Sequence, residues 1–345
     1  MLDYKTKAEL LVLGVRTSIV PLRRGGGGPV GGIGFAVKDS ILSAPAVQSF
    51  AKESPYRLLE KDRDFWLYRG EEKIGKVKIP RVKYYEHTIK GISAGRFVAL
   101  DGVNALVTAV TRKCVHVDSG KKCVFCVIEE NVPEKQIFEK DPEDIAEAVK
   151  VAFEEDKSRH LTLTTGTPNL LDKGALKYSE VARRIKAEVK IPIHAQIEPV
   201  SRDYLELLYS SGIDTIGIHV ETYDERIRKA VVPGKPSIED YLKAWENAVE
   251  IFGEWNVSSW ILVGLGESVE SVLEGFKAMA ERGVYPYIAP YRPPPSSGGK
   301  TDLSHVIKVY DNLREFKGEY DIKLKFKAGC PRCTGCSAIL ELLSC

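Results

Sequence analysis

Residues 105–126 read ALVTAVTRKCVHVDSGKKCVFC. The stretch 105–111 consists of small apolar and β-branched residues, which predicts a buried strand. A loop with three cysteines follows this strand directly. Because the chemistry of a parallel-stranded barrel lies at the carboxyl ends of its strands, we expect this loop to belong to an active site.

The alternation that begins with this strand continues along the chain. Short β-branched runs are separated by amphipathic stretches, which indicates parallel strands joined by right-handed helical crossovers. We therefore predict an α/β protein in which residues 98–300 form a partial (β/α)6 TIM-like barrel. The predicted strands cover 105–111, 160–165, 192–196, 215–220, 258–263 and 285–289, and the predicted helices lie near 144–155, 179–188, 202–210, 238–252 and 270–282.

The regions on either side of the barrel have different patterns. Residues 1–97 contain apolar runs at 10–13, 34–37, 65–68 and 76–79 that predict short strands, so a small N-terminal α+β subdomain is expected. Residues 301–345 form a cysteine-rich C-terminal extension. Within the barrel, Asp141 before Pro142 and Ser237 before an acidic pair are typical helix starts.

The composition describes a globular chain with little net charge. Of the 345 residues 43% are hydrophobic, 28% are charged, and the formal net charge is +2. Such values allow a large core and give no strong field that would attract nucleic acid. No apolar run reaches the roughly 18 residues of a membrane span, and the first residues do not resemble a signal peptide. A cytoplasmic protein without a membrane partner is expected.

The cysteines fall into two groups, one on the loop at 114–126 and one at 330–345. In a reducing cytosol this clustering favours metal binding over disulfides. Cys114, Cys123 and Cys126 offer three thiolates, which complete three irons of a [4Fe–4S] cluster and leave the fourth iron open for chemistry. The alternative is a structural zinc ion with His116 as the fourth ligand.

The second group reads Cys330-Pro-Arg-Cys333-Thr-Gly-Cys336 and is followed by Cys345. Its C-x2-C-x2-C spacing is typical of ferredoxin-type ligand runs, so a second [4Fe–4S] cluster is predicted. Cys345 is the candidate fourth ligand, although the helical pattern at 337–343 also allows it to lie elsewhere. Structural zinc is the alternative at this site as well.

Polar or glycine-containing segments follow each of the other predicted strands. Because these segments lie at the same end of the barrel as the cysteine loop, their residues are candidate site residues. Each also has a structural interpretation, such as a turn glycine, a helix-start carboxylate or, for the Pro-rich stretch after Arg292, a rigid connector. The candidates are Thr165, Gly166 and Thr167 after the second strand, Glu198 after the third, Glu221 after the fourth, Gly264 after the fifth, and Arg292 after the sixth.

These motifs resemble those of the radical-SAM superfamily and, within it, the biotin-synthase-like branch. The resemblance covers residues 100–295 and rests on the three cysteines of the loop, on Phe125, on the turn 165–167, and on Gly264 with Glu267. The chain departs from the family in the spacing of its first two cysteines, in a Thr-Gly-Thr turn, and in Trp260, where a glycine is common.

The resemblance implies a cofactor pair and roles for the candidate residues. The open iron of the first cluster would bind S-adenosylmethionine (SAM), whose reductive cleavage gives a radical that removes hydrogen from an unactivated carbon. Phe125 would pack near the adenine, residues 165–167 would bind the methionine part, and Gly264 would let the adenine approach the backbone. Glu221 would bind the ribose or the amino group, and Glu198 would face substrate or cofactor.

Including its C-terminal cysteines, the chain resembles the second type of subunit of the archaeal split lipoyl synthase. In that family two biotin-synthase-like proteins each insert one sulfur into a protein-bound octanoyl chain. The implied partners are an octanoylated carrier protein or peptide, a second radical-SAM enzyme, and an electron donor such as ferredoxin. Another radical-SAM reaction, with the C-terminal cluster relaying electrons or positioning substrate as in peptide-modifying enzymes, and a non-catalytic metal-binding module remain as alternatives.

Overall fold

The computed structural model describes the chain except residues 20–30, 129–136, 295–296, 324–325 and 345. Its largest element is a curled sheet with the strand order β14-β13-β12-β11-β10-β9-β8. Strands β9 to β14 are parallel, and β8 is antiparallel to β9. The strands are β8 (Ala99–Asp101), β9 (Ala105–Ala109), β10 (His160–Thr164), β11 (Ile193–Gln196), β12 (Thr215–Gly217), β13 (Val257–Val263) and β14 (Val284–Pro290).

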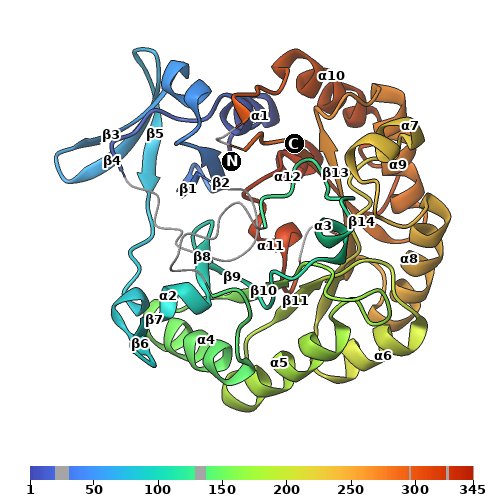
Figure 1. The fold of residues 1–345 in the computed structure, drawn as a ribbon. Helices are drawn as coiled ribbons and strands as arrows, with labels where there is room; N and C mark the ends of the chain where they lie inside the picture. Colours follow the sequence, from blue (N-terminus) through green and yellow to red (C-terminus); the bar gives the residue numbers. More distant parts are fainter. Residues whose placement is uncertain (20–30, 129–136, 295–296, 324–325, 345) are drawn as a thin grey trace.

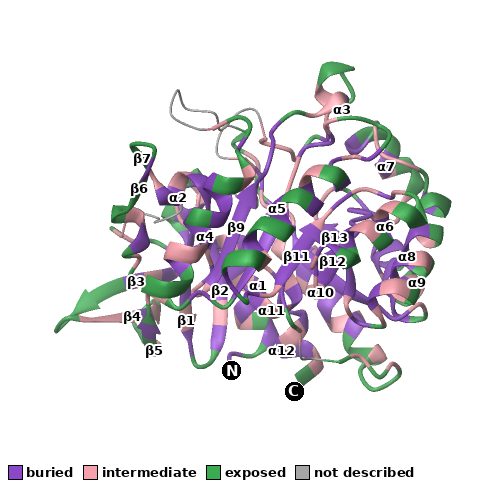
Figure 2. Cartoon of the chain, turned by 90° about the horizontal axis from the view of Figure 1, so that it is seen from below, coloured by how far each residue is buried: buried purple, intermediate pink, exposed green. Residues whose placement is uncertain are grey.

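Helices cover the outside of this sheet, so the strands are the most buried part of the chain (Figures 1 and 2). The predicted partial barrel of six parallel strands is therefore confirmed, with a seventh, antiparallel edge strand that the sequence did not indicate. The outer helices are α4 (Pro142–Asp156), α5 (Ala175–Glu188), α6 (Arg202–Ser210), α7 (Glu225–Val231), α8 (Ile238–Phe252), α9 (Val269–Ala280) and α10 (Leu303–Leu313).

Two of these helices begin as the sequence predicts. The side chain of Asp141 accepts a hydrogen bond from the backbone of Glu143, with Pro142 in the first turn of α4. Ser237 and Asp240 form a reciprocal capping box at the start of α8. Both caps satisfy backbone N–H groups that have no partner inside the helix.

The N-terminal region forms a second sheet, antiparallel throughout, with the strand order β2-β1-β5-β4-β3. The β3–β4 hairpin projects from the body of the molecule (Figure 1). The expected strands at 34–37, 65–68 and 76–79 correspond to β1, β4 and β5. The strands are β1 (Gly32–Val37), β2 (Ser40–Pro45), β3 (Tyr56–Lys61), β4 (Asp64–Arg69) and β5 (Glu72–Lys78), and the short β6 (Thr88–Ile89), β7 (Ile92–Ser93) and α2 (Ala94–Phe97) lead to the barrel.

The expected strand at 10–13 is wrong, because these residues belong to helix α1 (Tyr4–Leu13). A short apolar run fits either a strand or a helix, and here packing against two different cores determines that a helix forms. Ala8 and Val12 pack into the barrel core, whereas Leu10 packs into the core of the N-terminal sheet. A helix buries residues on several sides and so joins the two cores. None of the described helices is long and apolar enough to cross a membrane.

The C-terminal extension returns into the barrel. It contains α11 (Cys330–Cys333), which lies inside the ring of strands, and α12 (Ile339–Ser344), which lies beside α1 (Figure 1). The backbone N–H of Ser43 in β2 donates to the carbonyl of Gly335, 2.7 Å away. The two ends of the chain are therefore packed against each other.

Candidate active site

The first cysteine group lies on the loop that leaves the carboxyl end of β9. Within the eight-residue spacer, α3 (Val115–Asp118) forms a single helical turn directly after Cys114. The Cys126 N–H donates to the Cys123 carbonyl at 3.0 Å, and Val124 N–H donates to the carbonyl of Val231 at 3.0 Å. These bonds bring Cys123 and Cys126 close together and fasten them to the end of α7.

The Thr-Gly-Thr turn after β10 supports the other end of this loop. A Cβ atom on Gly166 would lie 2.3 Å from the carbonyl oxygen of Lys113 and 3.0 Å from the Cβ of Cys114, so only glycine fits there. The Val115 N–H donates to the carbonyl of Thr167 at 2.8 Å. Thr165 lies at the same junction, 3.4 Å from the carbonyl of Thr111.

Glu198, two residues beyond β11, joins these segments. Its Oε1 accepts hydrogen bonds from Thr167 at 2.6 Å and contacts His116 Nε2 at 2.9 Å. Burial acts to raise the pKa of Glu198, but the hydrogen bond from His116, the charge of Lys235 and the bond from Thr167 together lower it. A Cβ on Gly234 would lie 2.4 Å from His116 Nδ1. The ring is thus enclosed, which argues against the zinc alternative with His116 as a ligand.

A second carboxylate, Glu221, follows β12 and forms an ion pair with Lys235, at 2.9 Å. Glu221 has a φ of 68°, an uncommon conformation for this residue type. Burial raises the pKa of Cys123 to about 12, and the nearby positive charge of Lys235 opposes that rise. Sequence reasoning missed Lys235, because its contact with Glu221 is visible only after the loop at 231–236 has folded back.

The turn after β13 adds the last residues to this group of candidate site residues. Glu267 is fully buried and accepts hydrogen bonds from the N–H groups of Gly264 and Leu265, both at 2.7 Å. Gly264 has a φ of 113°, which requires glycine. Leu265 packs with Phe125 and Cys126 in one small apolar cluster. The fold therefore brings together the candidates from the first five strand ends.

Arg292 is the exception. It follows β14, and its Nη2 donates to the carbonyl of Ser43 in β2. This contact fastens the N-terminal sheet to the barrel end.

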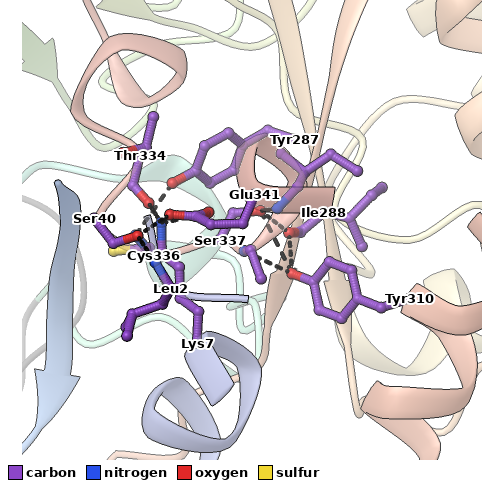
Figure 3. A network of polar contacts seen from close by, with 12 residues as sticks. Leu2, Lys7, Ser40, Tyr287, Ile288, Tyr310, Thr334, Cys336, Ser337 and Glu341 are labelled. Carbon is purple, nitrogen blue, oxygen red and sulfur yellow. Dashed lines mark hydrogen bonds and ion pairs between the residues drawn. The ribbon is translucent and has the colours of Figure 1, made fainter. Parts of the chain in front are cut away.

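The second cysteine group lies inside the barrel. The Gly329 N–H donates to His160 Nδ1 at 3.3 Å, and a Cβ on Gly329 would lie 2.6 Å from the ring of His194. Gln196 Nε2 donates to the sulfur of Cys330 at 3.5 Å, and the Cys336 N–H donates to the hydroxyl of Tyr287 at 3.2 Å (Figure 3). Strands β10, β11 and β14 thus surround this segment. Cys345 lies outside the described residues.

A stacked row of rings lines the barrel wall beside these cysteines. The His219 ring stacks on Trp260 with centroids 4.8 Å apart, and Trp260 stacks on Tyr287 at 5.6 Å. His219 is buried, and neither of its ring nitrogens has a hydrogen-bond partner among the residues that the structure describes.

Both groups present the donor set and the close glycine contacts that suit an iron–sulfur cluster. Gly166 lies against Cys114, and a Cβ on Gly102 would lie 2.9 Å from the sulfur of Cys333. In the described part of the chain no three His, Cys, Asp or Glu side chains converge on a point that would hold a metal ion.

Residues 110–279 match the family model of the radical SAM superfamily. This chain is a radical SAM protein. Membership implies a [4Fe–4S] cluster and SAM, and the loop with Cys114, Cys123 and Cys126 is the part of the matched region that carries three cysteines. The match begins at the carboxyl end of β9, directly before this loop, and extends through the turn that contains Gly264.

The radical SAM chain is also similar to several curated proteins. It is 23% identical to a bacteriochlorophyllide c C-7(1)-hydroxylase of Chlorobaculum limnaeum, over 93% of this chain and 87% of that protein. It is 27% identical to a lipoyl synthase of Alkaliphilus metalliredigens, over 51% of this chain and 60% of that protein. Among solved structures, the hydrogenase maturase HydG of Carboxydothermus hydrogenoformans has a TM-score of 0.48 at 21% identity, covering 60% of this chain and 49% of that one.

The close approach at Gly166 predicts the effect of adding one methyl group. Gly166→Ala should displace the loop at Cys114 and lower the iron bound by this group at least severalfold, because the obstructing atoms are backbone. Iron per chain and the visible absorbance after anaerobic reconstitution measure the change. Gly120→Asn on the same loop is the control, since Gly120 has open space around it and asparagine tolerates its φ of 70°. Equal iron in both variants would contradict this packing.

Removing the three thiols of the loop tests the assignment of the SAM cluster. The Cys114→Ala, Cys123→Ala, Cys126→Ala variant should lose about four irons per chain and form no 5′-deoxyadenosine from SAM. Iron analysis and chromatography of the nucleoside products under dithionite check both outcomes. Continued 5′-deoxyadenosine formation by the triple variant would rule this loop out as the cluster site.

Proposed function

We propose that this radical SAM enzyme inserts sulfur at an unactivated C–H bond, and that its substrate is a protein-bound octanoyl-lysine, as in lipoyl cofactor assembly. Cys330, Cys333 and Cys336 would hold a second [4Fe–4S] cluster that serves as the sulfur source. Cys345 remains the candidate for its fourth ligand. An octanoylated carrier protein, a second radical SAM enzyme and a ferredoxin-like electron donor are the proposed partners.

One observation carries this proposal: a single strand end contacts Cys330 of the second group and the loop that carries the first group. Gln196, the last residue of β11, donates to the sulfur of Cys330. Two residues later, Glu198 binds His116 in the loop that carries Cys114. A substrate carbon that lies beside this strand end is therefore close to both groups. That arrangement suits a reaction in which hydrogen removal and sulfur delivery occur at one carbon.

The barrel wall beside the C-terminal cysteines suits radical chemistry. Leu262 is 9% exposed and Tyr287 is 1% exposed, and the stacked rings of His219 and Trp260 extend the same surface. Such a lining limits the access of water to a reactive carbon. When bound, the first cluster with SAM would supply the hydrogen-abstracting radical, and the second would supply sulfur.

The similarity to lipoyl synthases supports sulfur insertion, but it spans only about half of this chain. The similarity to the bacteriochlorophyllide hydroxylase spans 93% of the chain and favours a second candidate function, the hydroxylation of a C–H bond. In that case the C-terminal cluster would relay electrons or position the substrate. The two candidates differ in the atom that the product gains.

Isotope labelling separates the two candidates. Enzyme whose clusters are built with ³⁴S-sulfide should convert an octanoyl-lysyl peptide to a product that contains ³⁴S, at no more than about one insertion per chain, because the sulfur source is consumed. Mass spectrometry of the peptide, with and without added partner enzyme, measures this. Unlabelled sulfur, or a product that gains ¹⁸O from labelled water and no sulfur, would refute sulfur insertion.

The matched variant is Cys330→Ala, Cys333→Ala, Cys336→Ala. It should lose about half of the iron and all thiolated product, yet still cleave SAM, because the loop with Cys114 remains intact. Thiolated product from this variant would show that the C-terminal cysteines are not the sulfur source.

A further inference from the structure

Helix α1 and the C-terminal extension meet in a fully buried network of charges (Figure 3). Lys7 of α1 donates to both carboxylate oxygens of Glu341 in α12, at 2.8 and 2.9 Å. It also donates to the carbonyl of Thr334 at 3.0 Å. Thr334 lies between Cys333 and Cys336 and has a φ of 57°. A lysine from the first turns of the chain thus holds the turn that carries the C-terminal cysteines.

The hydrogen-bond geometry fits an ion pair between Lys7 and Glu341. Glu341 accepts from Lys7 at both oxygens and from the hydroxyl of Ser40 at 2.8 Å, which fits an ionised carboxylate. The ammonium of Lys7 uses its three donors on Glu341 and Thr334. Ser40 is itself fixed by the N–H of Leu2, at 3.0 Å. Among the described residues, the donors of Leu2, Lys7 and Ser40 in this network each have an acceptor.

Stability alone does not account for a pair of this kind. Taking two charges out of water costs several kcal/mol, and apolar residues of similar size often hold two helices together as well or better. The side chains of Lys7 and Glu341 are both 0% exposed. The surrounding contacts of α1 are already apolar, through Ala8 and Val12. The charge itself is therefore the property that an apolar pair would not reproduce.

The charge of Lys7 acts on the cysteines. The Nζ of Lys7 lies 3.0 Å from the carbonyl oxygen of Thr334, the residue that follows Cys333. A cluster with thiolate ligands is negatively charged, so a buried ammonium beside it favours uptake of an electron.

We propose that Lys7 is a positioning residue for the C-terminal cluster: it fixes the Cys333–Cys336 turn through Thr334 and raises the reduction potential of the cluster that the turn holds. The inference rests on the cluster of the proposed function. It also gives the N-terminal helix a part in the site, since the site is complete only when α1 is packed against α12.

The test is a comparison of two charge variants in the full-length chain. The background is Cys114→Ala, Cys123→Ala, Cys126→Ala, so that only the C-terminal cluster is present. Lys7→Met should lower the midpoint potential, because it removes the positive end of the buried ion pair beside the turn. Glu341→Gln should raise it, because it removes the negative end and leaves Lys7 in place. Redox titration followed by electron paramagnetic resonance measures both.

Lys5→Met is the matched control. Lys5 lies on the same helix and pairs with Asp311 at 2.9 Å, but its side chain is 49% exposed, so its loss should leave the potential unchanged. A purely structural role for the pair predicts loss of iron in both Lys7→Met and Glu341→Gln, with no opposite shifts. If Lys7→Met binds no cluster at all, Glu341→Gln still tests whether the buried charges shift the midpoint potential in the expected direction.

Two results would overturn the inference. The first leaves the proposed function intact, whereas the second also removes the cluster on which that function rests. Potentials that are unchanged in both variants, or shifted in the same direction, would refute the role of Lys7 alone. If replacing Cys330, Cys333 and Cys336 by Ala removed no iron, the cluster of the proposed function would be absent, and the inference would fail with it.

Discussion

The structure depends on one constraint, the insertion of the C-terminal cysteine turn into a barrel whose other end carries the first cysteine group. Strand β11 meets both, with Gln196 on the sulfur of Cys330 and Glu198 on His116 of the first loop. The turn is held from the opposite side by Lys7 and by the N–H of Ser43. The N-terminal sheet, the barrel and the C-terminal extension are therefore parts of one site, although they are distant in sequence.

Much of the barrel could be predicted from the sequence, because its six parallel strands are short apolar runs and helices α4 and α8 begin at recognisable capping residues, whereas α7 and α10 were not predicted. The cysteine loop and the turn at Gly166 follow strand ends, where chemistry is expected in such a fold. The helix at 4–13 could not be predicted from its apolar run, since its form is decided by two cores that it joins. The pairs Lys235–Glu221 and Lys7–Glu341 were missed for the same reason: both depend on contacts between distant segments.

The radical SAM assignment and the proposed reaction rest on different parts of the chain. The family match ends at residue 279 and includes only the first cysteine group. In the proposed reaction, the C-terminal turn beside Gln196 and Tyr287 would supply the atom that the substrate radical gains. The match to the bacteriochlorophyllide hydroxylase covers 93% of this chain, whereas the match to the lipoyl synthase of Alkaliphilus metalliredigens covers 51% of it.

The most direct test of this account is to locate the metal inside the protein. Anomalous diffraction from crystals of the anaerobically reconstituted enzyme, measured on both sides of the iron and zinc absorption edges, identifies each metal and its position. The account predicts two iron clusters on opposite sides of the end of β11, one at Cys114, Cys123 and Cys126 and one at Cys330, Cys333 and Cys336. A single cluster, zinc at the C-terminal cysteines, or a second cluster outside the barrel would contradict it.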